Sequence, residues 1–456
     1  MGFAENREDY IRDIYREFKE CFVKEAGEDG LRLIDPFEKR VIGFHYGETH
    51  FAVAFILFGY LQDDKKIYTT GKELLSNFLA NISVYQKEKE YHWDFNNFAL
   101  CILIEFLEKY QINDGILNAE ELKKVVMKQQ DSVHGTINWM PMRMMTNRKK
   151  YDWTGDSYYL AKADVYMSKI KEAAYEDGFF EDFLPKGKSF NFQYHIYTVA
   201  LLSALSVRFE DVTLSPLSIQ RCVDIVDPEG DINYFGRGCN QIFAWGPALY
   251  LFYTNGIQKE CDHINEYFSS HFSAALKNKN LILNQENGAE RSWWWDYHYS
   301  TVYFAHFAFW ISLTYIDGVG SESVIKEAGD VSGDSGVVLR RKGRSFVCQF
   351  GGRQKYLAER GPVIANATID GITLFKGPLG PCGQMFGNKY SRPISSIINY
   401  LGPIKEKLLC GKILILQNVM PAEIKSSVEE QSVSITYNLK KRENGLRFSF
   451  PAQVDL

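Results

Sequence analysis

Two segments separated by a short loop place proton-handling side chains at the start of a predicted helix. The first reads EDGFFED at 176–182, and the second reads NFQYHIY at 191–197. The pattern sets Gln193, Tyr194 and His195 on the first helical turn, where the helix dipole favours developing negative charge. Tyr194 and His195 could act there as base and acid, with Gln193 binding substrate. The alternative is that they are ordinary capping and core residues.

A second segment, DINYFGRGCNQ at 231–241, carries Tyr234 and Arg237, which we expect among the catalytic residues of the same cleft as Tyr194 and His195. Two glycines flank Arg237 just before a predicted helix at 240–253, and glycine lets the backbone bend sharply. Arg237 would therefore project from the start of that helix. A guanidinium placed there can bind a carboxylate through two hydrogen bonds, or lower the pKa of a neighbouring tyrosine. The alternative is a structural turn in which the arginine pairs with a local acid.

Two adjacent amides, Asn96 and Asn97, open an otherwise apolar helix in HWDFNNF at 92–98. Burying amides is costly unless they cap the helix or bind something. Asn96 as an N-cap is a good structural explanation. Because only one of the pair can cap the helix, the other remains available for a ligand.

Aromatic residues gather in WWWDYHY at 293–299, which includes Trp294 and His298. Aromatic faces stack on the C–H faces of sugar rings, and polar ring edges supply hydrogen bonds. The alternative is a packed wedge in the core, but three consecutive tryptophans cannot all point inward from one helix. Asn138 and Trp139 could line the same cleft.

The elements that must position these residues are predicted to be helices. Apolar residues recur at helical spacing through most of residues 1–320, with no convincing strand between the helices. So many paired helices indicate an (α/α) toroid or a large bundle. The predicted helices cover 7–24, 49–61, 71–85, 94–110, 119–128, 157–175, 191–208, 215–226, 240–253, 262–276 and 299–315.

The pattern changes in the last third of the chain, where short alternating runs are separated by Gly and Pro. They lie at 332–350, 369–376, 412–419, 433–438 and 446–450. All eight Trp and all nine His precede residue 311. We therefore expect an α+β multidomain chain, with a catalytic toroid at 1–320 and an antiparallel β-sandwich-like support domain at 330–456.

Composition excludes several classes of function. The formal net charge is -5, and no Lys/Arg-rich run is present, which argues against a nucleic-acid partner. The longest apolar stretch, 51–61, is too short to span a membrane. Eight scattered cysteines without a C-x-x-C pair predict neither a metal site nor a disulfide framework. Charged residues at the start predict no secretion signal, so a cytoplasmic location is expected. No cofactor is expected.

Taken together, the segments resemble the heparinase II/III-like and chondroitin-lyase-like polysaccharide lyases of the (α/α)-toroid class. FNNFAL at 95–100 looks like the family's Asn-bearing helix start, which neutralises a uronate carboxylate. DGFFED at 177–182 followed by QYH at 193–195 looks like the segment whose tyrosine transfers a proton. YFGRG at 234–238 is similar to the arginine-bearing loop of the chondroitin-lyase branch.

The resemblance implies β-elimination from an acidic polysaccharide or oligosaccharide. In that chemistry the C5 proton of a uronic acid is abstracted once its carboxylate is neutralised, here by Asn96 or Asn97 together with Arg237. Tyr194 would serve in proton transfer. The family usually takes a histidine from its β domain, but this β region has none. That role would therefore fall to His195 or His298.

Two other functions remain open from the sequence. A toroidal glycoside hydrolase, including the type that removes unsaturated uronyl ends, needs a pair of carboxylates, for which the candidates are Asp177, Asp182, Asp231 and Asp296. The third reading is a non-catalytic glycan-binding or assembly protein that keeps the cleft. Fold alone does not fix function.

Overall fold

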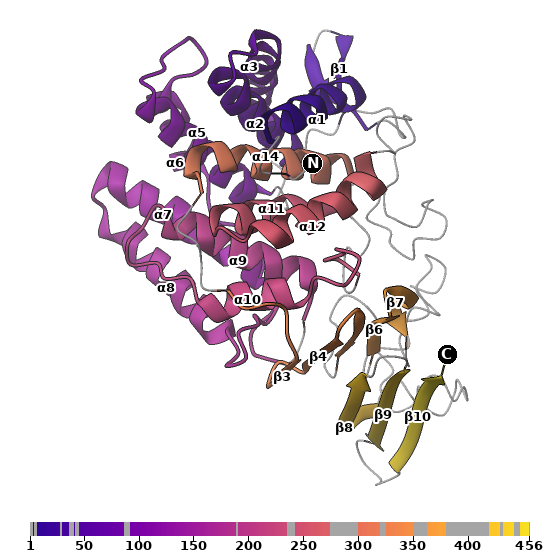
Figure 1. The fold of residues 1–456 in the computed structure, drawn as a ribbon. Coiled ribbons are helices and arrows are strands. Elements are labelled where there is room, and N and C mark those ends of the chain that lie inside the picture. Colours follow the sequence, from indigo (N-terminus) through magenta and orange to yellow (C-terminus); the bar gives the residue numbers. More distant parts are fainter. Residues whose placement is uncertain are drawn as a thin grey trace, which may run out of the picture.

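The computed structural model is mostly helical, with antiparallel β-structure in its C-terminal third (Figure 1). It describes residues 3, 7–27, 30–35, 41, 45–85, 92–187, 190–234, 242–273, 300–319, 325–350, 363–379, 419–428, 432–441 and 447–455. Arg237, Trp294, Asp296 and His298 lie outside these residues.

Six helices of the described chain form a closed inner ring, in which each packs against the next and the last packs against the first. In order around the ring they are α2 (Gly47–Leu61), α5 (Trp93–Lys109), α7 (Met140–Thr154), α9 (Phe192–Ser206), α11 (Trp245–Thr254) and α14 (Ser300–Asp317). The contacts within this chain therefore establish the toroid.

Each inner helix has an outer partner that alternates with it along the chain. The outer helices are α1 (Arg7–Phe22) on α14, α3 (Lys65–Ala80) on α2, α6 (Ala119–Lys128) on α5, α8 (Ser157–Ala173) on α7, α10 (Pro216–Asp224) on α9 and α12 (Gln258–Phe268) on α11. A short helix α4 (Ile82–Tyr85) follows α3, and a hairpin of β1 (Val23–Glu25) and β2 (Leu31–Leu33) follows α1.

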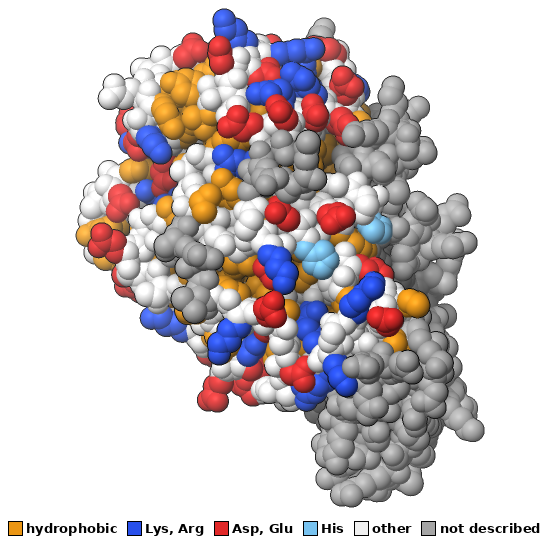
Figure 2. Space-filling view, in the orientation of Figure 1, with side chains coloured by type: hydrophobic (Ala, Val, Ile, Leu, Met, Phe, Trp, Pro, Cys, Tyr) orange, Lys and Arg blue, Asp and Glu red, His pale blue; other side chains and the backbone are white. Residues whose placement is uncertain are grey.

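Burial explains which helices are inner and which are outer. In α2 every residue from Gly47 to Gly59 is buried, whereas α6 buries only Leu122 and Val126. A helix that is apolar all round must be covered on all sides, but an amphipathic helix needs one covered face. Figure 2 shows acidic and basic side chains interspersed over the outer face of the toroid.

An ion-pair network joins inner helices at the end of the ring where their C-termini lie. Arg208, just after α9, donates to Glu105 of α5 over 2.8 Å and to Asp317 of α14 over 2.9 and 3.0 Å. Tyr250 of α11 also donates to Asp317, over 2.6 Å. Burial alone would lower the pKa of Arg208, but the two carboxylates outweigh burial and raise the pKa above its usual value. Four inner helices are therefore joined near their C-terminal ends, where a cation also complements the helix dipoles.

One inner helix was not predicted. The sequence of α7 has no clear apolar period because Arg143, Asn147 and Lys150 occupy buried positions. Each of these side chains has a buried or half-buried partner: Asp94, Asp131 and the Gln129 carbonyl, respectively. The other predicted helices are confirmed with shifts of a few residues at their ends, apart from two. The one at 71–85 is split into α3 and α4. The one at 262–276 is α-helical only to Phe268, is followed by a π-helical turn over Ser269–Ser273, and lies outside the described residues from 274.

The C-terminal third forms two antiparallel sheets. The first, in the order β3-β4-β5-β6-β7, contains β3 (Val331–Ser332), β4 (Val337–Lys342), β5 (Ser345–Phe350), β6 (Val363–Ile369) and β7 (Ile372–Leu379). The second, in the order β10-β9-β8, contains β8 (Val419–Val428), β9 (Ser432–Lys441) and β10 (Arg447–Asp455). The predicted strand at 412–419 lies almost wholly outside the described residues. That the two sheets form a closed sandwich, and that a separate domain begins near residue 330, stay predictions.

The first sheet is fastened to loops of the toroid. Asn366 of β6 donates to Asp227 over 2.8 Å, and Ser335, just before β4, donates to Asp177 over 2.7 Å. Arg341 of β4 donates to the Asp224 carbonyl over 2.8 Å. The sheet thus braces the loops before α9 and after α10. None of the described helices has the length and apolar character needed to cross a bilayer.

Candidate functional site

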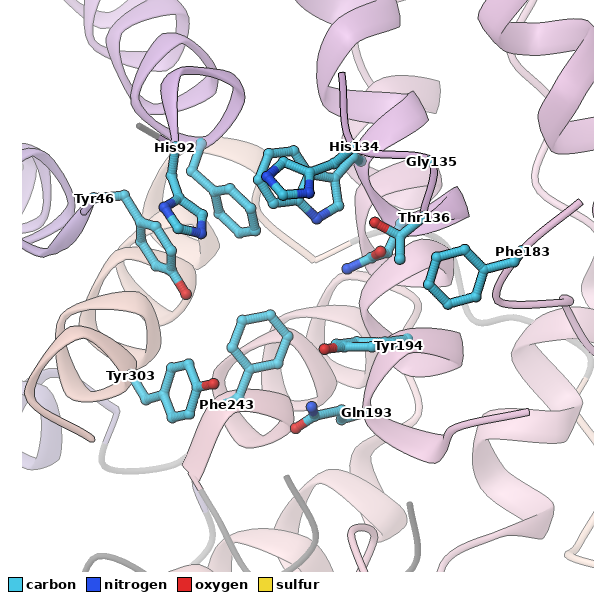
Figure 3. A pocket seen from close by; sticks show the side chains of 13 residues that line it. Tyr46, His92, His134, Gly135, Thr136, Phe183, Gln193, Tyr194, Phe243 and Tyr303 are labelled. Carbon is cyan, nitrogen blue, oxygen red and sulfur yellow. The ribbon is translucent and has the colours of Figure 1, made fainter. Parts of the chain in front are cut away.

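A pocket of about 210 Å³ opens where the N-terminal ends of all six inner helices meet (Figure 3). Each lining residue outside the rim belongs to, or directly precedes, the first turn of an inner helix. The lining consists of Tyr46 at α2, His92 and Phe95 at α5, Asn138 and Trp139 at α7, Gln193 and Tyr194 at α9, Phe243 at α11 and Tyr303 at α14, with His134, Gly135, Thr136 and Phe183 on the rim side.

The convergence of helix N-termini has an electrostatic consequence. Each N-terminus carries a partial positive charge of roughly half an electron, which arises from the aligned peptide dipoles of its helix. Six of them point toward the same hollow, so the pocket favours an anionic group before any charged side chain is considered.

Three tyrosine hydroxyl groups face the pocket from different sides. Figure 3 shows the phenol oxygens of Tyr46, Tyr194 and Tyr303 directed toward the open space. Tyr46 and Tyr303 are almost fully buried, whereas Tyr194 is partly exposed. Their phenol groups can donate a proton or, once ionised, accept one.

Histidine and tryptophan rings form one wall. The Nδ1 atoms of His45 and His92 lie 3.1 Å apart. The ring of His92 then faces Trp139 at 5.4 Å and His134 at 6.2 Å between centroids, and His134 lies 4.4 Å from Trp139. His134 is exposed and Trp139 is 8% exposed, so the wall runs from the rim to the interior. It offers both stacking surface and ring nitrogens.

Two buried amides complete the polar lining. Asn138 and Gln193 are 3% and 1% exposed, and the Oδ1 and Oε1 atoms have no hydrogen-bond partner among the described residues. Leaving buried polar atoms unpaired costs about 1–3 kcal/mol each. Because the oxygen and nitrogen of an amide exchange places on rotation, each side chain can offer either NH₂ donors or a carbonyl acceptor to a ligand.

The floor beneath these groups is aromatic and apolar. Phe243 stacks on His306, and Phe95 stacks on Tyr46 with ring centroids 4.2 Å apart. Burial lowers the pKa of His50 to about 3 and holds the pKa of His306 well below its usual value. Both imidazoles below the floor are therefore neutral at physiological pH.

A buried network holds the rim in place. Ser132 donates to Asp94 over 2.7 Å, and Arg143 donates to Asp94 over 2.8 Å and to Ser132 over 2.7 Å. Burial raises the pKa of Asp94, although Arg143 and Ser132 oppose that effect. Arg143 also lies 5.7 Å from the centre of the Trp139 ring. The network links α5, α7 and the segment that carries His134.

The structure brings four of the predicted site residues together in the pocket: Asn138, Trp139, Gln193 and Tyr194. Asn96 and Asn97 lie in the first turn of α5 but do not line the pocket. The N-cap of α5 is His92, so Asn96 does not cap it as proposed. Arg237, Trp294 and His298 lie outside the described residues.

The structure does not place His195 or Tyr234 in the lining of the pocket. His195 is 1% exposed among Phe179, Phe180 and Phe190, and its Nδ1 accepts from the Phe180 backbone over 3.3 Å. Burial lowers the pKa of His195 to about 3, with Arg221 adding to the effect. It occupies the face of α9 turned away from the pocket.

Tyr234 is fully buried where the toroid meets the first sheet. Its hydroxyl donates to the Ile225 carbonyl over 2.8 Å, and its ring packs against Phe192 and Phe346. Burial raises the pKa of Tyr234 well above its usual value. Tyr234 therefore joins the toroid to the first sheet and does not line the pocket.

Sequence reasoning missed Tyr46, His92, His134, Phe243 and Tyr303. A usable signal existed, because four of the five stand at or just before the start of a helix. Only the closed ring shows that these starts converge. Among the described residues, no three His, Cys, Asp or Glu side chains are grouped closely enough to hold a metal ion.

No protein-family model matches this chain, and no curated protein matches it in sequence. Several solved structures are similar at very low identity. The GH76A α-1,6-mannanase from Salegentibacter sp. HEL1_6 shares 10% identity at a TM-score of 0.45, covering 68% of this chain and 99% of its own. A polysaccharide lyase shares 11% at 0.42, covering 69% and 99%. An unsaturated glucuronyl hydrolase mutant from Streptococcus agalactiae shares 12% at 0.40, covering 68% and 90%.

Proposed function

We propose that this protein is a glycan lyase that cleaves uronic-acid-containing oligosaccharides or polysaccharides by β-elimination. The observation that carries the proposal is the chemistry of the lining. Among the described lining residues, the polar side chains are phenols, imidazoles, amides, one indole and one threonine hydroxyl, without a carboxylate. Phenols and imidazoles transfer protons, and amides bind carboxylates.

The pocket suits one sugar ring. Its volume of about 210 Å³ is smaller than pockets for drug-sized ligands, which run from roughly 300 to 1,000 Å³. A single uronate ring can stack against the wall of His92, His134 and Trp139, as sugars do on aromatic faces. The remainder of a glycan would extend past the exposed rim.

Neutralising the carboxylate is the requirement that comes before proton abstraction. Asn138 and Gln193 can donate NH₂ groups to the uronate, and the converging helix N-termini stabilise its charge. As the C5 proton leaves, negative charge moves onto that carboxylate, so the same groups stabilise the transition state. Tyr194, on the opposite side of the pocket from His92 (Figure 3), can protonate the leaving oxygen.

A hydrolase needs two carboxylates at the scissile bond. Of the candidates, Asp177 accepts hydrogen bonds from Ser335 at the sheet junction, and Asp231 accepts from Asn233 and Tyr267. Neither Asp177, Asp182 nor Asp231 lines the pocket, and the fourth candidate, Asp296, lies outside the described residues. The hydrolase is therefore an outcome of the test below, and not the function we favour.

The test is to incubate the full chain with a panel of polyuronates, their oligomers and unsaturated oligosaccharides. A lyase produces an ultraviolet absorbance increase on saturated polyuronates, whereas an unsaturated uronyl hydrolase removes the absorbance of unsaturated oligomers. Tyr194→Phe should lower the lyase rate by about 10²–10⁴-fold. Tyr158→Phe is the matched control because Tyr158 is 60% exposed on α8.

Two other outcomes would favour one of the alternative functions over the lyase. Loss of absorbance with unsaturated oligomers, and no gain with any polyuronate, would replace the lyase by the hydrolase. Binding of an oligouronate by calorimetry without turnover, and with affinity unchanged in Tyr194→Phe, would identify a glycan-binding protein.

A further inference from the structure

We propose that His92 is the proton acceptor of this pocket and that His45 is a positioning residue that fixes and resets its protonation. The inference rests on the proposed lyase function for its catalytic part. Its structural part, a proton shared between two rings, stands on geometry alone.

The contact between the two rings restricts their protonation. The Nδ1 atoms of His45 and His92 are 3.1 Å apart, which is a hydrogen-bond distance. Such a contact needs one N–H and one lone pair, so a single proton lies between the rings. A neutral imidazole carries one N–H, and the state of Nδ1 therefore determines the state of Nε2.

The other nitrogen of His92 faces the substrate space. Figure 3 shows His92 with one ring nitrogen toward the pocket, and this is Nε2 because Nδ1 contacts His45. When His92 donates its Nδ1 proton to His45, its Nε2 presents a lone pair and can act as a base. When His45 is the donor, His92 presents an N–H instead. The pair therefore sets whether the pocket contains a base.

The buried amide of Asn96 fixes the backbone at His45 relative to the backbone at His92. Asn96 donates to the His45 carbonyl over 3.1 Å and to the His92 carbonyl over 2.8 Å. Thr49 donates to the Asn96 Oδ1 over 2.6 Å, which fixes the amide's orientation. Asn96 is 0% exposed, so solvent does not compete for these bonds. This arrangement brings together two histidines that lie 47 positions apart.

The groups that face this pair come from three segments. The Tyr46 ring, before α2, lies 5.7 Å from His92, and His134 of the rim lies 6.2 Å away. Asp94 follows His92 within α5, but it is held by Arg143 and Ser132. The titratable groups near the pair thus include one phenol, one imidazole and one compensated carboxylate.

The proposed step conserves atoms and charge. The C5 proton moves to His92 Nε2, and the Nδ1 proton of His92 moves to His45 Nδ1. The electron pair of the C5–H bond forms the C4–C5 double bond, and the bond from C4 to the leaving oxygen breaks. The leaving oxygen takes the hydroxyl proton of Tyr194. Transfer of one proton from the histidine pair to the Tyr194 phenolate, through solvent, restores the enzyme.

The structural part is tested without a substrate. The full chain, labelled with ¹⁵N-histidine, is studied by long-range ¹H–¹⁵N correlation, with assignments from His45→Asn and His92→Gln. We expect complementary tautomers, one ring protonated at Nδ1 and the other at Nε2. His45→Asn should move the His92 signals, whereas His263→Asn on outer helix α12 should leave them in place. Identical tautomers, or His92 signals unaffected by His45→Asn, would overturn the coupling.

The catalytic part uses whichever polyuronate the panel identifies. His92→Gly should lose at least about 10²-fold in kcat and regain activity with added imidazole, since a lost base can be replaced from solution. His45→Asn should lower kcat while KM changes little. A His92→Gly variant that stays folded by circular dichroism and is not rescued, or His45→Asn that changes KM alone, contradicts these roles. A chain inactive on every polyuronate overturns the lyase function and this step together, and the spectra then decide the ring coupling separately.

Discussion

The ring of Phe243 lies parallel to that of His306, with 4.3 Å between centroids and 6° between planes. Phe243 faces the pocket and His306 lies directly beneath it, fully buried. Neither nitrogen of His306 has a hydrogen-bond partner among the described residues. The floor of the pocket is therefore a stacked pair in which the lower imidazole is sealed from solvent.

The buried histidines make the fold sensitive to acid. Burial lowers the pKa of His50 to about 3, against an unfolded value near 6.5. The unfolded chain therefore binds more protons than the folded chain between those pH values. The contribution of neutral His50 to the unfolding free energy is complete above about pH 6.5 and is lost as the pH drops toward 3. His50→Leu should reduce the slope of unfolding free energy against pH in that window by up to about 1.4 kcal/mol per pH unit. Chemical denaturation at several pH values from 4 to 7 measures this slope. Phe309→Leu, beside His50, should shift the whole curve and keep the slope.

Removing Arg208 should destabilise the toroid strongly. Arg208→Met leaves Asp317 buried without its cation, and breaking such a pair costs about 3–5 kcal/mol. Lys124→Met removes an exposed partner of Glu121 and should change the unfolding free energy far less, because solvent screens an exposed ion pair. Urea unfolding at pH 7 compares the two variants. Equal small losses would mean that the network does not hold the ring together.

The amide of Asn138 should discriminate in favour of an anionic substrate. Asn138→Asp places a carboxylate in the pocket, which repels a uronate and removes the NH₂ donor. We expect kcat/KM on the active polyuronate to fall by about 10- to 100-fold, as for other lost hydrogen bonds to charged groups. Asn113→Asp makes the same change at an exposed site and serves as the control. Unchanged kinetics in Asn138→Asp would argue against binding of the carboxylate at this amide.

Ser132 should influence the pocket through the rim. Ser132→Ala removes the hydroxyl that joins Asp94 to Arg143, and with it part of the hold on the segment carrying His134. KM should rise several-fold while kcat changes less, because stacking and not proton transfer is affected. Steady-state kinetics measure both constants. Ser168→Ala, on the exposed face of α8, is the control and should behave as the wild type. A fall in kcat alone would assign Ser132 a different role.

Part of the candidate site could be read from sequence because it depends on local order. Tyr194 and Gln193 follow the N-cap residue Asn191 at the start of α9, a position that composition and spacing reveal. His195 is adjacent in sequence, but the 100° rotation per helical residue turns it into the phenylalanine cluster. The same local pattern therefore contains both a pocket residue and a core residue.

The amino-acid sequence by itself determined the alternation of helices and the later strands, because apolar periodicity is a local property. It also placed most helix starts within a few residues. Only the tertiary structure decided which starts meet. Closing the ring brings Tyr46, His92, Phe243 and Tyr303 to one hollow from segments far apart in the chain, and the same closure sends Tyr234 into dry packing. Helix α7 shows the reason: its buried polar residues are acceptable only because partners such as Asp94, on another helix, satisfy them.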